Sequence, residues 1–428
     1  MRKPVLMTAP RIIVSGATTA ITRRTTLRKA FLAPWHPMVS EIFRYALADA
    51  QRHTDVAIHH ATCVITHHHL TVTPERDNLP EFTRRFHRDS SCGLNTLLIQ
   101  ERYDAPREIF DGRSTHCMRL CDATAQITQL AYEHNNCVAA GLVKRPEDMP
   151  GMFFDFDLWK TEYLDVPRPP VYFDASRPEV IRMRISPPPL LLQAFDGDLD
   201  RLVHHMKRVS EHAGQELRAA RNRPVLGARE VQRIHPWSEP PSLRERGGER
   251  VPTFRIGARG IDGRLTSIAA ARETHAFRSE HRTMRLARKA GDFGARFPYG
   301  TYDMRVHHAA PVEAEPKATA LVAKPGPSLA DVRAQLQAER TPQVRAQCHA
   351  ESIQLMDQAR AALHDEAPEL IAGDEFSFDK ADMPTASPTP STPDADAPVV
   401  RHRFSRRLGS DGVSPAAPRR IITLRDAR

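Results

Sequence analysis

The first 155 residues alternate between segments with helical and strand periodicity. Residues 37–53 predict a helix, because apolar side chains recur there at steps of three and four and form one stripe. Pro37 suits the first turn of this helix, where its missing N–H costs nothing. The stripe consists of Val39, Ile42, Phe43, Ala46 and Ala50.

Further elements follow from the same kind of pattern. Residues 9–34 contain β-rich stretches, and residues 56–65 and 67–73 resemble strands. Residues 79–98 predict a second helix, residues 101–121 look irregular, and Asp122 is a plausible N-cap for a third helix that runs to about Asn136. This order predicts an α+β domain over residues 9–155, in which helices pack on a small antiparallel sheet.

The remainder of the chain divides into three parts. Residues 165–310 predict a mixed, mainly helical extension, with a strand where Ile181, Met183 and Ile185 alternate with arginines and a helix over 191–222. A helical segment is expected over residues 325–365. Residues 367–428 are rich in Pro, Ser, Thr and Asp and then basic, a composition that predicts a disordered tail.

Composition excludes several classes of protein. Only 40% of the residues are apolar and 35 are proline, and no apolar run approaches the ~20 residues of a membrane helix. A collagen, a coiled-coil rod and a transmembrane bundle are therefore excluded. The opening residues lack the apolar stretch of a signal peptide, so we expect a cytoplasmic protein. Its six cysteines form no CxxC pair and are expected to be reduced thiols.

Arginine dominates the charge of the chain. The 61 basic residues include only nine lysines, and they exceed the 52 acidic residues by nine. Because guanidinium groups match phosphate oxygens and stack on bases, this balance favours a polyanionic partner, although a GC-rich genome also enriches arginine. In the second helix, Arg84, Arg85 and Arg88 are candidates for DNA contact, or for an ordinary solvated face.

Two segments carry candidate chemistry. Side chains of a strand alternate between faces, so His67 and His69 project together and could share a divalent metal, while His68 points the other way. In the third helix, Tyr132 lies off the apolar stripe, where a tyrosine kept for packing should not be. Asn136 shares a face with Tyr132 one turn later, so a hydroxyl and an amide oxygen point the same way; Asn136 could also only cap the helix end.

These two segments resemble the motifs of the REP-associated tyrosine transposases, single-tyrosine members of the HUH endonuclease superfamily. The family's N-H-V-H-L strand matches Thr66-His67-His68-His69-Leu70, and its Y-I-x-x-N-P-V-x-A-G-L-V block matches YEHNNCVAAGLV at 132–143. Both blocks stand in the family's order and at its spacing. The resemblance covers about residues 9–310. It departs from the family at His68, which replaces an aliphatic residue, and at Cys137, which replaces proline.

The resemblance implies a ferredoxin-like catalytic domain in a cytoplasmic, bacterial, transposase-like enzyme that cuts and rejoins single-stranded or hairpin DNA. Tyr132 would be the nucleophile and would form a 5′-phosphotyrosine link. His67 and His69 would hold a magnesium or manganese ion, and Asn136 matches the position that can supply a third ligand. Members of the family often act as homodimers.

Two other functions remain open from the sequence. The altered surroundings of the motifs and the long extension would also suit a catalytically inactive, domesticated binder of structured single-stranded DNA. The histidine cluster alone would suit a metal-binding scaffold protein. A zinc site at His116, Cys117 and Cys121 is disfavoured by its poor ligand spacing.

Overall fold

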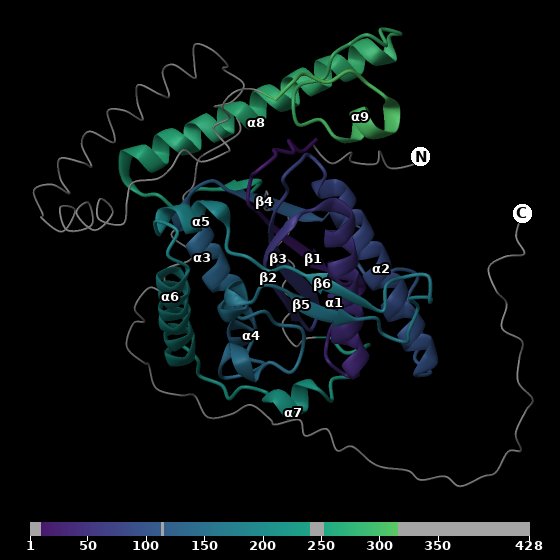
Figure 1. Ribbon diagram of the computed structural model, residues 1–428, viewed down its shortest axis with the longest axis vertical. Coiled ribbons are helices and arrows are strands. Elements are labelled where there is room, and N and C mark those ends of the chain that lie inside the picture. Colours follow the sequence, from purple (N-terminus) through teal and green to yellow (C-terminus); the bar gives the residue numbers. More distant parts are fainter. Residues whose placement is uncertain (1–9, 113–114, 240–251, 316–428) are drawn as a thin grey trace, which may run out of the picture. The chain divides into compact units, whose positions relative to one another are not determined.

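A five-stranded sheet organises the chain, in the order β2-β3-β1-β4-β7. Figure 1 labels the first four of its strands in the sequence. The computed structural model describes residues 10–112, 115–239 and 252–315. The first four strands are antiparallel, and with the helices after β1 and β3 they give the βαββαβ connectivity of a ferredoxin-like domain. The expected α+β class is confirmed. The strands are β1 Thr19–Arg24, β2 Ala57–Val64, β3 His67–Thr73, β4 His116–Leu120 and β7 Phe254–Arg255.

Helices cover both faces of this sheet. Helices α1 (Pro37–Thr54) and α2 (Leu79–Gln100) lie on the face to which His68 points, since the His68 ring contacts Phe43 of α1 and Phe86 of α2. Helix α3 (Ala123–His134) and the short helix α4 (Asn136–Ala139) follow β4. Because the His69 ring contacts Tyr132, α3 lies on the opposite face. Strand β3 therefore places His68 among the aromatic rings of α1 and α2 on one face of the sheet, and His69 beside Tyr132 on the other face.

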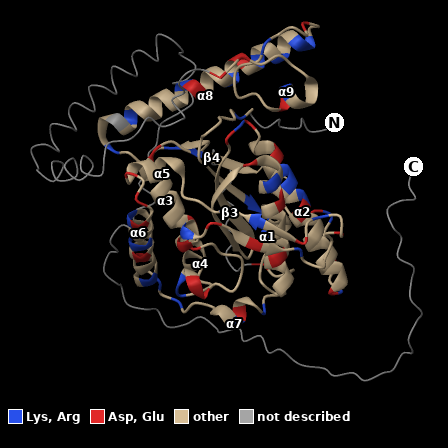
Figure 2. Ribbon diagram, viewed as in Figure 1, with Lys and Arg blue, Asp and Glu red and all other residues tan. Residues whose placement is uncertain are grey.

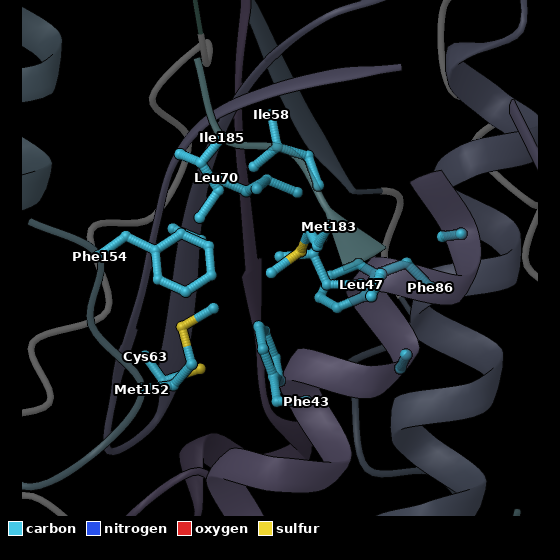
Figure 3. Packing of buried hydrophobic residues seen from close by; sticks show 14 of the residues in the cluster. Phe43, Leu47, Ile58, Cys63, Leu70, Phe86, Met152, Phe154, Met183 and Ile185 are labelled. Atoms are coloured by element: carbon cyan, nitrogen blue, oxygen red, sulfur yellow. The ribbon is translucent and has the colours of Figure 1, made fainter. Parts of the chain in front are cut away.

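The main core lies between the sheet and helices α1 and α2. All five residues of the predicted α1 stripe are buried. Phe43 and Phe86 belong to one cluster with Leu70 of β3, part of which Figure 3 shows. The rings of Phe43 and Phe86 meet edge to face, with their centroids 4.8 Å apart. Met183 and Ile185, from the extension, belong to the same cluster. The extension thus completes the hydrophobic core of the first 155 residues.

One strand occupies a segment whose sequence looks irregular. β4 lies within residues 101–121 and pairs with β1 from Thr19↔Arg119 to Thr22↔His116. Its five residues HCMRL are too few and too polar to show a clear alternation, so the strand is defined by its hydrogen-bonded neighbour. Conversely, residues 11–14 form no strand, and β1 begins only at Thr19.

The extension adds elements to the side and edge of the sheet. Its β5–β6 hairpin is two-stranded and antiparallel, and the predicted alternation is confirmed, with Ile181 and Met183 buried. The helix expected over 191–222 is divided by a turn at Asp196 and Gly197, both with positive φ. Its elements are β5 Leu164–Pro167, β6 Val180–Met183, α5 Pro189–Ala194, α6 Leu199–Ala219, α7 Ala228–Val231, α8 Gly260–Lys289 and α9 Asp303–His308. Three short helical turns precede it in the chain, namely η1 Thr26–Arg28, η2 Pro146–Asp148 and η3 Phe156–Lys160.

Two sequence predictions fall outside the described residues, namely the helical segment 325–365 and the tail 367–428. Within the described ranges, no helix combines the length and the apolar composition needed to cross a membrane.

Candidate active site

The two histidines predicted to act together lie side by side on β3. The rings of His67 and His69 are 4.9 Å apart between centroids and nearly perpendicular. Thr22 Oγ1 lies 3.0 Å from Nδ1 of His69 and fixes the orientation of that ring, while the buried Nε2 of His69 has no hydrogen-bond partner among the described residues. Burial lowers the pKa of His69 well below its usual value and that of His67 to about 4. Both imidazoles are therefore neutral and able to act as ligands at neutral pH.

The predicted tyrosine lies directly beside these rings. Tyr132 is 50% exposed although its neighbours on α3 are buried, and its ring meets that of His69 edge to face at 5.6 Å. Asp122 caps the helix by accepting from Ala125 N at 2.7 Å, as its sequence position predicts. Partial burial raises the pKa of Tyr132, and a hydrogen bond with Asn136 opposes this effect. The phenol is thus neutral at pH 7 but accessible to a ligand.

Asn136 acts on both the tyrosine and the first histidine. Its side chain is buried, and hydrogen bonding to it raises the pKa of His67 and lowers that of Tyr132. The backbone at the end of α3 is hydrogen-bonded instead by the side chain of Asn135, whose Nδ2 donates to Ala131 O at 3.1 Å. The side chain of Asn136 therefore belongs to the group of Tyr132, His67 and His69, which we call the tyrosine site.

A divalent metal fits the tyrosine site with a sparse set of donors. The unpartnered Nε2 of His69 is the kind of buried atom that a metal would satisfy. No group of three or more His, Cys, Asp or Glu side chains suited to a metal occurs among the described residues, so the third protein ligand would be the amide of Asn136. Two imidazoles and one amide leave coordination positions for water or phosphate oxygens, as in catalytic sites.

The arginines predicted for DNA contact lie on the other face of the sheet. Arg84 and Arg88 are exposed on α2, whereas Arg85 pairs with Glu81 at 3.0 Å.

One arginine on the face that carries the tyrosine was not predicted from the sequence. Arg24 of β1 is exposed and stands opposite His67 in the strand register. Its positive charge lowers the pKa of both His67 and Tyr132. Its place opposite the first histidine could have indicated it.

A buried carboxylate beneath the tyrosine was also missed. Glu133 is fully buried and accepts hydrogen bonds from Thr71 Oγ1 at 2.8 Å and from Gln129 Nε2 at 2.9 Å. His60 Nδ1 lies 3.6 Å from the same carboxylate. These bonds tie α3 to β3 two residues beyond His69, and so they set the position of Tyr132 over the histidines. Nothing in the sequence indicated that the charged side chain of Glu133 would point into the interior of the protein.

The unusual middle histidine has a partner. His68 is fully buried, and its Nε2 lies 3.0 Å from Nε2 of His87 on α2. One ring donates and the other accepts, so each imidazole has a hydrogen-bond partner at Nε2, whereas the buried Nδ1 of His68 has none among the described residues. Burial first, and the charges of Arg23 and His67 next, lower the pKa of His68 to about 3. The pair is a structural feature of the α1–α2 face and lies away from Tyr132.

Comparisons with known proteins give weak structural likenesses. No family model matches the chain, and no curated protein matches it. A solved structure of a REP-associated tyrosine transposase bound to a REP hairpin shares 17% identity over 34% of this chain and 81% of its own, with a TM-score of 0.29. A Deinococcus radiodurans R1 protein assigned to the transposases shares 16% over 30% of this chain and 94% of its own, with a TM-score of 0.21. At such TM-scores the likeness alone assigns no function.

Proposed function

We propose that this chain is a transposase-like enzyme that nicks and rejoins single-stranded or hairpin DNA through Tyr132. The observation that carries the proposal is the tyrosine site itself. An exposed phenol on α3 contacts the ring of His69, which in turn contacts the ring of His67 on the same strand. The buried amide of Asn136 lowers the pKa of the phenol and raises that of His67. Packing does not require an exposed tyrosine there, whereas attack on a phosphodiester does.

The reaction exchanges one phosphodiester for another. Tyr132 Oη forms a bond to phosphorus, and the bond from phosphorus to the 3′-oxygen breaks. The phenol loses its proton, and the departing 3′-oxygen takes one up as a hydroxyl. The product is a 5′-phosphotyrosine, so the bond energy is retained and a second 3′-hydroxyl can reverse the step without ATP.

Each residue of the site has a distinct task in this reaction. Asn136 holds the phenol by a hydrogen bond that favours its ionised form. Arg24 brings positive charge to the side of the site where the phosphate would lie. A magnesium or manganese ion held by His67, His69 and Asn136 would supply Lewis-acid polarisation of the scissile phosphate. Imidazole ligands favour manganese over magnesium in such a site.

The test is trapping of the covalent intermediate. The full chain is mixed with 5′- and 3′-labelled hairpin DNA and manganese and then denatured, and the DNA that migrates with protein is measured. We expect a covalent adduct with wild type that is lost in Tyr132→Phe and on addition of EDTA. Tyr163→Phe, at an exposed tyrosine just before β5, is the matched control and should keep the adduct.

The other outcomes separate the remaining functions. An equal adduct in Tyr132→Phe would exclude this tyrosine as the nucleophile. Tight, salt-sensitive DNA binding without cleavage under any divalent ion would support the domesticated binder instead. Retention of zinc through dialysis with no DNA affinity at low salt would support the metal-binding scaffold. The homodimer stays a prediction, which sedimentation of the full chain would test.

A further inference from the structure

A basic pocket lies on the sheet face opposite to Tyr132. It has a volume of about 400 Å³ and is formed by the first half of α2, the end of β1, and Glu108, Phe110 and Thr115. We call it the α2 pocket. Blue segments in Figure 2 mark basic residues on α2. The side chains that line it include those of Arg23, Arg84, Arg88, Ser91, Glu108 and Phe110.

The charge of the α2 pocket suits an anion. Among the described residues, three arginines line it against a single carboxylate, that of Glu108. Arg84 and Arg88 are exposed one helical turn apart, and neither forms a salt bridge with any other described residue. Arg85, which lies between them in sequence, is paired with Glu81 and does not line the pocket. The two exposed arginines that face the pocket thus keep their charge available for a ligand.

The third arginine is held in a fixed orientation. Arg23 lies over the ring of Phe110 at 5.3 Å, and its Nη2 donates to Asp111 O at 3.4 Å. Its buried Nε has no hydrogen-bond partner within the described part of the chain. Ser91 Oγ accepts a hydrogen bond from Ile109 N at 3.4 Å, which leaves its own proton for another acceptor. An unpartnered guanidinium N–H and a hydroxyl beside two exposed arginines are donors that phosphate oxygens satisfy.

The strand β1 connects this pocket to the tyrosine site. Arg23 and Arg24 are consecutive, so their side chains point to opposite faces of the sheet. In the register of the sheet Arg23 stands opposite His68, and Arg24 stands opposite His67. Adjacent Cα atoms are about 3.8 Å apart. Two arginine side chains therefore flank the end of a single strand, one on each face of the sheet.

We propose that the α2 pocket binds a backbone phosphate of the same DNA whose scissile phosphate reaches Tyr132, and that Arg23, Arg84 and Arg88 are its ligands. The proposal rests on the proposed function and adds a second contact, remote from the chemistry, that holds the DNA while its ends are exchanged. Such a contact carries affinity and salt dependence rather than sequence specificity.

The experiment compares neighbouring arginines of the same helix. Binding of a fluorescein-labelled single-stranded 24-mer to the full chain is measured at several salt concentrations for wild type, Arg84→Gln/Arg88→Gln and the control Arg85→Gln. Because the substituted side chains of the double variant are exposed, we expect it to fold. We expect its Kd to rise about tenfold and its log–log salt slope to fall by roughly 0.7 for each phosphate that it no longer neutralises, whereas Arg85→Gln stays within about twofold of wild type.

Each outcome decides the pocket separately from the chemistry. If the double variant and Arg85→Gln share the Kd and slope of wild type, the pocket holds no phosphate, whether or not the adduct forms. If wild type binds and the double variant weakens but no adduct appears, the pocket stands and the nicking reaction fails. If polyglutamate displaces the DNA equally well at matched charge, the pocket is a site for acidic protein segments and the nucleic-acid assignment is overturned.

Discussion

At the scale of single residues, the His68–His87 pair shows how a polar side chain is accommodated in an aromatic core. The rings of Phe43, Phe86 and Phe110 surround His68 at centroid distances of 5.3 to 5.7 Å. Its polar partner is Nε2 of His87, at 3.0 Å. Each imidazole therefore depends on the other for its hydrogen bond, and the two act as one unit in the stability of the fold.

This dependence predicts a non-additive pair of substitutions. His68→Leu alone should lower the free energy of unfolding by about 1–3 kcal/mol, because it leaves a buried nitrogen of His87 unpaired. His68→Leu/His87→Leu removes both polar groups and should recover much of that loss. Urea denaturation of the two single variants and the double variant completes the cycle. Additive losses would show that the imidazoles are stabilised independently.

A second residue gives the fold a defined response to acid. His59 is buried with Nδ1 2.7 Å from Ser186 O and Nε2 2.7 Å from Thr73 Oγ1, and burial lowers its pKa to about 4. The imidazole takes up this proton near pH 6.5 in the unfolded chain. The contribution of His59 to the free energy of unfolding is therefore fully present above pH 6.5 and is lost as the pH falls toward 4.

The size of that loss can be measured. By linkage, His59 alone should remove about 3 kcal/mol of stability between pH 7 and pH 4. His59→Gln keeps a donor and an acceptor but does not titrate, so its unfolding free energy should fall less steeply over this range. Guanidinium denaturation at pH 7, 6, 5 and 4.5 gives both slopes. Parallel curves for wild type and variant would contradict the prediction.

At the scale of elements, α3 is fastened on two sides. Glu133 ties it to β3, and its last turn is tied to α6 of the extension through Ser210. The hydroxyl of Ser210 accepts from Asn135 Nδ2 at 2.7 Å and lies 2.7 Å from Nδ1 of His134. Figure 1 shows α3 and α6 side by side. Two anchors from different elements therefore restrict the motion of the helix that carries Tyr132.

Removal of the second anchor should affect both stability and chemistry. Ser210→Ala leaves polar groups of His134 and Asn135 buried without this partner, so we expect a loss of about 1–3 kcal/mol of unfolding free energy. We also expect slower formation of the DNA adduct at a temperature where the variant is fully folded. Arg208→Ala, at an exposed position of the same helix, should change the unfolding free energy by less than about 0.5 kcal/mol. Equal effects of the two substitutions would contradict the anchor.

The sequence predicted those elements that can be recognised from the residues of the element alone. The α1 stripe, the strand 67–73 and the N-cap at Asp122 all follow from local rules, and each is confirmed. Alternation also placed His67 and His69 on one face, and helical spacing placed Tyr132 outside the buried stripe. Residues of one element can be placed relative to one another by its period alone.

What the sequence did not predict depends on partners distant in the chain. β4 is defined by its neighbour β1, and β7 by its pairing with β4, so neither short segment carries a sufficient signal. Glu133 points inward because Thr71 and Gln129 donate to it, and Arg23 joins Arg88 in one pocket only after β1 meets α2. Such contacts are set by tertiary structure, which local propensity does not encode.

At the scale of the whole molecule, the extension completes what the first 155 residues begin. β7 extends the sheet in parallel beside β4, and the backbone N–H groups of Gly257 and Ala258 donate to Asp122 at 2.8 and 3.1 Å, beside the N-terminus of α3. Arg255 donates to Gln129 Oε1 at 2.9 Å, and Gln129 in turn donates to the buried carboxylate of Glu133. Residues more than 120 positions away in sequence thus support the N-terminus and the middle of α3.

Asp122 has a consequence for anyone who would shorten this protein into a portable tool. One of its oxygens serves its own helix and the other serves residues 257 and 258. A chain that ends at residue 155 would keep every residue of the two sequence motifs. It would lose the hydrogen bonds that the second oxygen of Asp122 accepts from residues 257 and 258, and it would also lose Ser210. The minimal cassette worth cloning therefore ends beyond residue 258, and motif boundaries are a poor guide to where this polypeptide can be trimmed.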